Sequence, residues 1–237
     1  MVTLTIDGQV VTVPADYTVL EAAEAAGIRI PRLCYLKDVS QTGSCRVCVV
    51  EIGGRLQAAC VFPVSEGLEV KTNTPMVRES RRTTVELLLS NHPQDCLTCL
   101  RNQTCELQKL AQELNIRQVS FEGERTHFPI DLSSPSIIRD PNKCILCRRC
   151  ISVCSEIQGV DILAARERGF DTVVSPAWQE ELANTACTNC GQCVLVCPVG
   201  ALTEQDDTEK VWAALADPDT HVVVQTAPAV RVTLGEE

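Results

Sequence analysis

The sequence predicts an α+β fold made of three small modules, and three patterns carry this prediction. Residues 2–61 read as short strands interrupted by a single helix. Residues 74–91 have the apolar periodicity of one amphipathic helix. Beyond residue 143 the spacing C-x2-C-x2-C-x3-C occurs twice. Each module therefore carries its own cysteines.

Composition limits the classes of protein to which the chain can belong. It has 237 residues, a net charge of −10 at pH 7 and 3% aromatic residues. Such a chain lacks the basic surface and the stacking side chains that nucleic acids require, so we expect no nucleic-acid partner. The N-terminus has no signal-peptide pattern, and no apolar run approaches the ~18 residues of a membrane span. We therefore expect a cytoplasmic protein without a membrane span.

Cysteine is the unusual residue type, with 15 copies. An odd number fits a disulfide framework poorly, and a reducing cytoplasm keeps thiols free, so clustered cysteines indicate metal or redox chemistry. They fall into four groups with none left over: Cys34, Cys45, Cys48 and Cys60; Cys96, Cys99 and Cys105; Cys144, Cys147, Cys150 and Cys154; and Cys187, Cys190, Cys193 and Cys197.

The N-terminal module is expected over residues 1–75. VTLTIDGQVVTV alternates apolar and polar residues around Asp7-Gly8, which is a hairpin signal. Thr18 has the character of an N-cap for the helix VLEAAEAAG, which Gly27 ends. The strands RVCVVEI and RLQAACV follow. This order of elements resembles the β-grasp fold of [2Fe–2S] ferredoxins.

The first cysteine group lies in this module with the spacing C-x10-C-x2-C-x11-C. The plant-type ferredoxin spacing C-x4-C-x2-C is different, so the cysteine spacing alone is only moderately specific for a [2Fe–2S] cluster. The order of strands and helix strengthens this interpretation. Gly43 and Ser44 would let the loop turn close to cluster sulfides and donate N–H groups to them. We expect a [2Fe–2S] cluster held by Cys34, Cys45, Cys48 and Cys60, with zinc as the alternative.

A small helical module over residues 76–136 has three cysteines, one short of the usual four ligands. The helix 74–91 should end at His92-Pro93, because the residue before proline leaves the α region. His92 then opens the motif H-x3-C-x2-C-x5-C, whereas His127 has no ligand-like spacing. We expect a [4Fe–4S] cluster held by His92, Cys96, Cys99 and Cys105.

A neutral imidazole in place of a thiolate would change the charge of this site. An oxidised [4Fe–4S] core with four thiolates totals about −2, and with three thiolates and one histidine about −1. The less negative site accepts an electron more easily, so we expect a higher reduction potential than four cysteines would give.

The third module, residues 137–206, holds the two repeated cysteine runs. Their spacing is that of bacterial two-cluster ferredoxins, in which the fourth cysteine of each run ligates the other cluster. Zinc sites use pairs of C-x2-C and fit this spacing poorly. We assign one [4Fe–4S] cluster to Cys144, Cys147, Cys150 and Cys197, and a second to Cys187, Cys190, Cys193 and Cys154.

One segment departs from the ferredoxin pattern. Ser155 rather than proline follows Cys154, and residues 155–186 separate the two runs. Within them, VDILAARERGFDTVVSP reads as two short strands around Arg168-Gly169. We expect an insertion that covers one cluster and leaves the ligand assignment intact.

The order of these modules resembles the N-terminal electron-entry region of large, NADH-linked multimeric [FeFe]-hydrogenases. Related regions open the large iron–sulfur subunit of NADH dehydrogenases and occur in NAD-linked formate dehydrogenases, but the respiratory subunit usually lacks a complete two-cluster ferredoxin. Residues 207–237 are similar to the junction into the hydrogenase catalytic domain. HVVVQTAPAVRVTLGEE is similar to the opening strand and turn of that domain.

The resemblance implies an electron relay with one [2Fe–2S] and three [4Fe–4S] clusters and no catalytic residue. Every cysteine is already assigned, so we expect either the front part of a larger hydrogenase or a freestanding relay subunit. No glycine-rich nucleotide loop is evident. The implied partners are a hydrogenase catalytic domain in cis or in trans, an NADH-oxidising flavin subunit and a soluble ferredoxin. The alternatives are a relay of a formate dehydrogenase or NADH dehydrogenase-like complex, and a zinc-stabilised interaction protein.

Overall fold

A computed structural model describes residues 1–235 of the chain. It contains two compact units, Met1–Glu204 and Gln205–Glu237. The first unit carries every cysteine of the chain.

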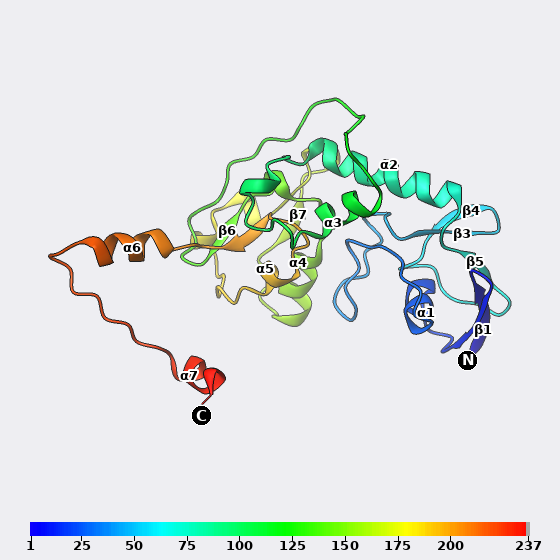
Figure 1. Ribbon diagram of the computed structural model, residues 1–237, viewed down its shortest axis with the longest axis horizontal. Helices are drawn as coiled ribbons and strands as arrows, with labels where there is room; N and C mark the ends of the chain where they lie inside the picture. Colours follow the sequence, from blue (N-terminus) through cyan, green and yellow to red (C-terminus); the bar gives the residue numbers. More distant parts are fainter. Residues whose placement is uncertain (236–237) are drawn as a thin grey trace. The chain divides into compact units, whose positions relative to one another are not determined.

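The N-terminal part of the first unit is a five-stranded sheet (Figure 1). Its strands are β1 (Val2–Ile6), β2 (Gln9–Val13), β3 (Val49–Ile52), β4 (Arg55–Ala58) and β5 (Glu69–Lys71), in the order β2-β1-β5-β3-β4. The β1–β2 pair is antiparallel with Ile6 opposite Gln9. Asp7 and Gly8 make the turn with φ values of 47° and 86°, which favour Asp and Gly. The expected β-grasp order and the hairpin are confirmed.

Helix α1 (Val19–Ala25) lies against this sheet. Its N-terminus is a capping box: the Thr18 hydroxyl accepts from the Glu21 amide at 3.3 Å, while the Glu21 carboxylate accepts from the Thr18 amide at 2.7 Å. Leu20 of α1 is buried with Leu4, Ile6 and Val50 of the sheet. The sequence expectation for this helix is confirmed at both ends.

Strand β3 is shorter than RVCVVEI suggested. It begins at Val49 because Arg46, with φ of 56°, takes a left-handed backbone conformation that no strand continues. The three residues before the strand instead belong to the cysteine loop. Strand β4 likewise ends at Ala58, before Cys60.

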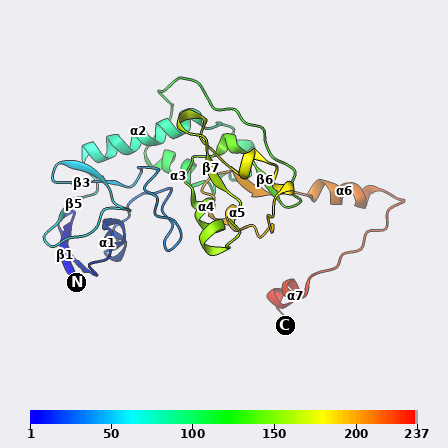
Figure 2. The ribbon, with the colours of Figure 1, turned by 180° about the vertical axis from the view of Figure 1, so that it is seen from behind.

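Helix α2 (Pro75–Asn91) runs from the sheet toward α3 and β7 in both views (Figures 1 and 2). Thr74 caps its start, and the buried Arg81 ties it to β3 by donating to the Val49 carbonyl at 2.6 Å. The helix ends at Asn91, and His92 after it has an extended backbone, as the following proline predicts. A 3₁₀ turn (Cys96–Thr98) and α3 (Glu106–Glu113) complete the helical module.

The third module is built around two short helical segments. α4 (Arg149–Ser152) continues into a π-helix (Val153–Ile157), and α5 (Gln192–Val196) ends at Cys197. The strands β6 (Ile137–Arg139) and β9 (Leu202–Glu204) pair antiparallel beside them. A second core unites this module with the other two, because Leu33, Val85 and Leu107 are buried in the same cluster as Ile137 and Val199.

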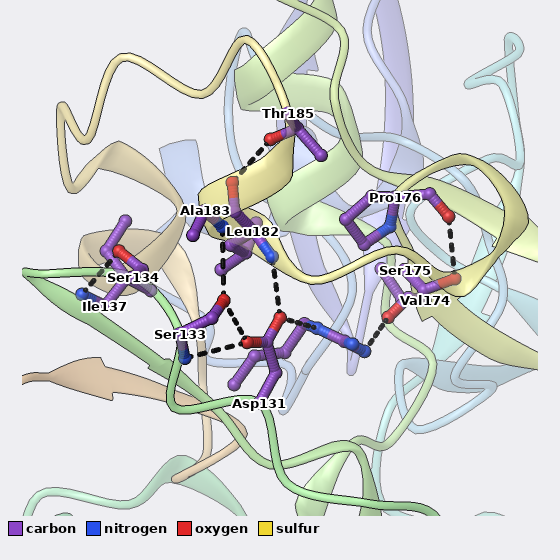
Figure 3. Close-up of polar contacts among 11 residues, drawn as sticks. Asp131, Ser133, Ser134, Ile137, Val174, Ser175, Pro176, Leu182, Ala183 and Thr185 are labelled. Carbon is purple, nitrogen blue, oxygen red and sulfur yellow. Dashed lines mark hydrogen bonds and ion pairs between the residues drawn. The ribbon is translucent and has the colours of Figure 1, made fainter.

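The insertion between the two cysteine runs contains the expected pair of strands. β7 (Ala164–Arg166) and β8 (Val173–Ser175) pair antiparallel around a 3₁₀ turn at Gly169–Asp171. Figure 3 shows how the insertion is held: the Asp131 carboxylate accepts from the Leu182 amide at 2.9 Å and from the Ser133 hydroxyl at 2.6 Å. Arg139 pairs with Asp131 at 3.5 Å and donates to the Val174 carbonyl at 3.3 Å.

The second unit contains α6 (Thr208–Ala216) and α7 (Pro228–Leu234). The strand expected at the start of HVVVQTAPAVRVTLGEE is a wrong prediction. Among the described residues of that segment, 221–227 have no regular secondary structure and 228–234 form α7. The apolar run is β-like in composition, but a strand needs a hydrogen-bonding neighbour, and this unit offers none among its described residues.

Candidate metal centres

The first cysteine group is fully inside the N-terminal module. Exposed fractions are 1%, 7%, 1% and 0% for Cys34, Cys45, Cys48 and Cys60. The Cys45 amide donates to the Cys34 sulfur at 3.5 Å. Gly43 lets the loop pass Val61 closely, since a Cβ there would lie 3.1 Å from the Val61 Cγ1 atom and its φ is +61°.

Hydrogen bonds between thiols join Cys34 to Cys45 and to Cys60, and Cys60 to Cys48. Hydrogen bonds from the Cys45 and Cys60 thiols lower the pKa of Cys34, and the bonds to Cys34 and Cys48 raise the pKa of Cys60. The Cys60 hydrogen bond also lowers the pKa of Cys48 to about 7. Four sulfurs that share protons in a dry loop fit a small cluster with four thiolate ligands.

His92 is positioned by the end of α2, and it has the chemistry of a neutral ligand. Burial, and then the nearby Lys143, lower the pKa of its imidazole. Its buried Nδ1 atom has no hydrogen-bond partner among the described residues. A buried, unpartnered ring nitrogen on a neutral imidazole fits a metal ligand.

The three cysteines of the helical module lie on the turn and on the start of α3. The Cys105 sulfur caps α3 by accepting from the Gln108 amide at 3.5 Å. Burial raises the pKa of Cys105, and the neighbouring Cys99 and Cys96 raise it further. Lys143 lies near both His92 and Cys99. Its charge lowers the pKa of the His92 imidazole, and the charge of Cys99 raises the pKa of the Lys143 ammonium group. Cys96 is exposed, so this site has one open side.

The last eight cysteines line two separate cavities. A small cavity is lined by Cys144, Cys147, Cys150 and Cys197. A second small cavity is lined by Cys154, Cys187, Cys190 and Cys193. The fourth cysteine of each run thus faces the cavity of the other run. Each of these two cavities is lined by the four cysteines that the sequence assigned to one cluster.

The two loops that carry these cysteines repeat one backbone geometry. Leu146 and Arg148 flank Cys147 with φ of 54° and 65°, and Asn189 and Gly191 flank Cys190 with 54° and 72°. A left-handed backbone is costly for leucine and arginine. Its recurrence at matched positions indicates that the loop must curl around something, which fits a cluster in each cavity.

Burial favours the protonated form of four of these thiols when no metal holds them, namely Cys144, Cys147, Cys150 and Cys193. Burial raises the pKa of Cys144 to about 11 and those of Cys147 and Cys193 to about 12. Because metal ligands must be thiolates, metal binding here would release protons.

The insertion contributes to both cavities, whereas the sequence suggested that it covers one cluster. Leu163 lines both, Val174 lines the first, and Leu182 lines the second.

Sequence reasoning missed the polar residues that join the modules. Arg101 donates to the Cys197 carbonyl at 2.7 Å, and the Glu106 amide donates to the Pro198 carbonyl at 2.9 Å. Gly200 packs on the sulfur of Cys99. The sequence signal for these contacts is weak, because basic and small residues near cysteines usually face solvent.

Gly200→Ala should destabilise the protein and perturb the His92 site selectively. A Cβ there would lie 2.9 Å from the Cys99 sulfur and 3.5 Å from Lys143 Cδ, so the sulfur must shift. We expect about 1–3 kcal/mol of lost stability by denaturant unfolding and an altered EPR signal from one cluster. Gly123→Ala is the control, since nothing lies within 4 Å of its Cβ position. An unaltered signal and stability in Gly200→Ala would contradict the close packing.

Three family models match successive parts of the chain. Residues 1–75 match a 2Fe-2S iron-sulfur cluster binding domain. Residues 81–120 match the NADH-ubiquinone oxidoreductase-G iron-sulfur binding region. Residues 134–203 match the ferredoxin-like domain of NADH-quinone oxidoreductase subunit 3.

Two curated relatives cover most or all of the chain. The NADP-reducing hydrogenase subunit HndD of Solidesulfovibrio fructosivorans is 50% identical over an alignment of 245 positions, which covers 100% of this chain and 42% of that subunit. A subunit of the NADH-quinone oxidoreductase of Rhizobium meliloti (strain 1021) is 43% identical over an alignment of 206 positions, which covers 85% of this chain and 24% of that one. The chain therefore spans less than half the length of each.

A solved structure agrees with the fold. A chain in the crystal structure of NAD+-reducing [NiFe]-hydrogenase in the H2-reduced state superposes with a TM-score of 0.82 at 35% identity. The match covers 86% of this chain and 87% of that chain.

The β-grasp module and the cysteine cavities define an iron–sulfur protein of the electron-transfer class, with binding domains for 2Fe–2S and 4Fe–4S clusters. Within that class, the chain belongs to the iron–sulfur family of NAD(P)-linked hydrogenase subunits, and it corresponds to their N-terminal iron–sulfur region. The NADH-quinone oxidoreductase subunit is similar to most of the same region, at 43% identity.

The described helices do not have the length and apolar character of membrane spans. No helix within residues 1–235 is both long enough and apolar enough to cross a bilayer.

Proposed function

We propose that the chain is the multi-cluster electron-transfer module of an NAD(P)H- or ferredoxin-linked [FeFe]-hydrogenase. It would pass electrons between a flavin subunit or a soluble ferredoxin and a catalytic H-cluster held by a partner domain, in cis or in trans. The observation that carries this proposal is that four groups of metal-ligand side chains lie in one compact unit, Met1–Glu204. The 50% identity to HndD favours the hydrogenase setting.

The proposal includes one [2Fe–2S] and three [4Fe–4S] clusters with the ligand sets assigned from the sequence. It also includes the domain boundaries 1–75, 76–136, 137–206 and 207–237. The burial of the first group, the orphan nitrogen of His92 and the two cysteine-lined cavities support these sets. A cytoplasmic location is part of the proposal, because the sites need free thiols.

The protein's own residues would hold and shield the clusters rather than make or break bonds. When bound, such clusters accept and release single electrons. The cysteine loops and His92 fix the cluster positions. Apolar residues such as Leu163 and Val199 exclude water, and Cys96 leaves one site open toward solvent or a partner.

Metal analysis tests the proposal directly. After anaerobic reconstitution, the protein should contain about 14 iron and about 14 acid-labile sulfide per chain, from one two-iron and three four-iron clusters. Substoichiometric iron would contradict the cluster count. A colourless protein with stoichiometric zinc would instead identify a zinc-stabilised interaction protein.

A relay chain in a hydrogenase of the [NiFe] type is the second candidate. It is favoured by the structural match, which covers 87% of the [NiFe]-hydrogenase chain. Metal analysis of the complex purified from source cells would separate the two candidates. Iron without nickel would favour the [FeFe] type, and nickel together with iron would favour the [NiFe] type. The NADH dehydrogenase-like alternative is not better supported, since that relative matches at 43% identity.

A further inference from the structure

Arg149 is a buried cation between two predicted ligands, Cys147 and Cys150. It opens helix α4, and its side chain is 6% exposed. A guanidinium in such a place must be satisfied by specific partners, because burying an unpaired charge is costly.

The partners of Arg149 come from all three modules. Its Nη1 and Nη2 atoms donate to both carboxylate oxygens of Glu106, at 2.7 and 3.0 Å. Nη2 also donates to the Tyr35 carbonyl at 3.3 Å, and Nη1 makes a longer contact of 3.5 Å to the Val196 carbonyl. These three residues directly adjoin Cys105, Cys34 and Cys197, which are predicted ligands of three different clusters.

Other buried arginines join fewer modules. Arg81 donates to the Val49 carbonyl, next to the first cysteine group. Arg139 bonds Asp131 and Val174 inside the third module. Neither spans the three cysteine-bearing segments as Arg149 does.

The charge of Arg149 is only partly cancelled by its partner. The Glu106 side chain is 43% exposed, whereas that of Arg149 is 6% exposed. Water therefore screens the carboxylate more than the guanidinium, and a net positive field remains on the buried side. Thiolate-ligated clusters become more negative on reduction, so a nearby positive charge favours their reduced forms.

We propose that Arg149 is a positioning residue of the relay, which fixes the loops bearing Cys34, Cys105 and Cys197 relative to one another and raises the reduction potentials of the clusters beside it. This inference rests on the proposed function, because it requires bound clusters. The Arg149 side chain would then both fix the distances between neighbouring clusters and raise their reduction potentials.

The test compares charge and geometry separately in the iron-loaded protein. Arg149→Gln removes the charge, and Glu106→Gln removes the partner's charge while keeping a hydrogen-bond acceptor. EPR-monitored redox titration should show lower potentials for at least two clusters in Arg149→Gln and higher potentials in Glu106→Gln. Shifts of the same sign in both variants would overturn the electrostatic role.

A matched control is the exposed pair Arg29–Glu113, which also joins the N-terminal module to α3 at 2.8 Å. The Arg29 side chain is 64% exposed, so Arg29→Gln should leave every potential at the wild-type value. Equal potentials and full iron in Arg149→Gln would overturn the proposal.

Arg149→Lys tests positioning even if the glutamine variant fails to hold iron. Lysine keeps the charge but cannot form the fork to Glu106 together with the Tyr35 contact. We expect near-wild-type potentials but altered spin–spin relaxation between reduced clusters. Unaltered relaxation would overturn the positioning role. Absence of iron in the wild-type protein would instead overturn the proposed function.

Discussion

Cys154→Ala should remove the cluster held by Cys187, Cys190 and Cys193, although Cys154 belongs to the other run. The reason is geometric: Cys154 lines the second cavity with those three residues, while Cys197 lines the first. Iron should fall by about four of the expected 14 atoms per chain, or one cluster should convert to a three-iron form. Iron analysis and EPR of the reduced protein would measure this.

Two further variants make this result specific. Cys197→Ala should remove the other ferredoxin-like cluster, so the two variants should lose different EPR signals. Ser155→Ala is the control beside Cys154, since the Ser155 hydroxyl donates to two backbone carbonyls, those of Ile151 at 3.0 Å and Ser152 at 3.5 Å. Loss of the same signal in both cysteine variants would contradict the crossed assignment.

His92→Cys should retain its cluster and lower its potential, whereas His92→Ala should lose or convert it. A fourth thiolate adds negative charge, which opposes the uptake of an electron. Alanine would leave a vacant ligand position where the buried Nδ1 now has no other partner among the described residues. EPR redox titration of the helical-module cluster would give both results.

The control for this experiment is the histidine that lacks ligand-like spacing. His127 is exposed, in the segment that follows α3, and His127→Ala should leave all signals unaltered. If both His92 variants match the wild type by titration, the histidine assignment is wrong. A change in His127→Ala instead would move the ligand to that residue.

Local signals explain why much of the fold could be predicted. The Asp7-Gly8 turn, the Thr18 cap and the proline after His92 each act within a few residues, so they can be read from sequence. The spacing of the two C-x2-C-x2-C-x3-C runs is enough to predict which cysteines line the same cavity. The resemblance to known proteins supplied the relation between the modules, which periodicity does not contain.

Contacts between distant residues explain what was missed. Arg149 meets Tyr35 across 114 positions and Glu106 across 43, and no local pattern marks such pairs. The failed strand near residue 221 has a related cause. Strand composition is local, but strand formation requires a neighbour, so an apolar run without a neighbour in its unit remains irregular.

The length of helix α2 sets both the distance and the direction of His92 relative to the sheet. Its 17 residues span roughly 25 Å, at about 1.5 Å per residue, from the sheet to His92. A single inserted residue would turn His92 and the cysteines that follow it by about 100° relative to the sheet, whereas seven would restore their direction but carry them about 10 Å further from it. The distance between the first cysteine group and the His92 site can therefore change only in steps of whole residues, and each step also changes the direction of His92. Substitution of a ligand residue can therefore adjust the reduction potential of these sites in small steps, but a change of helix length cannot adjust their separation in small steps.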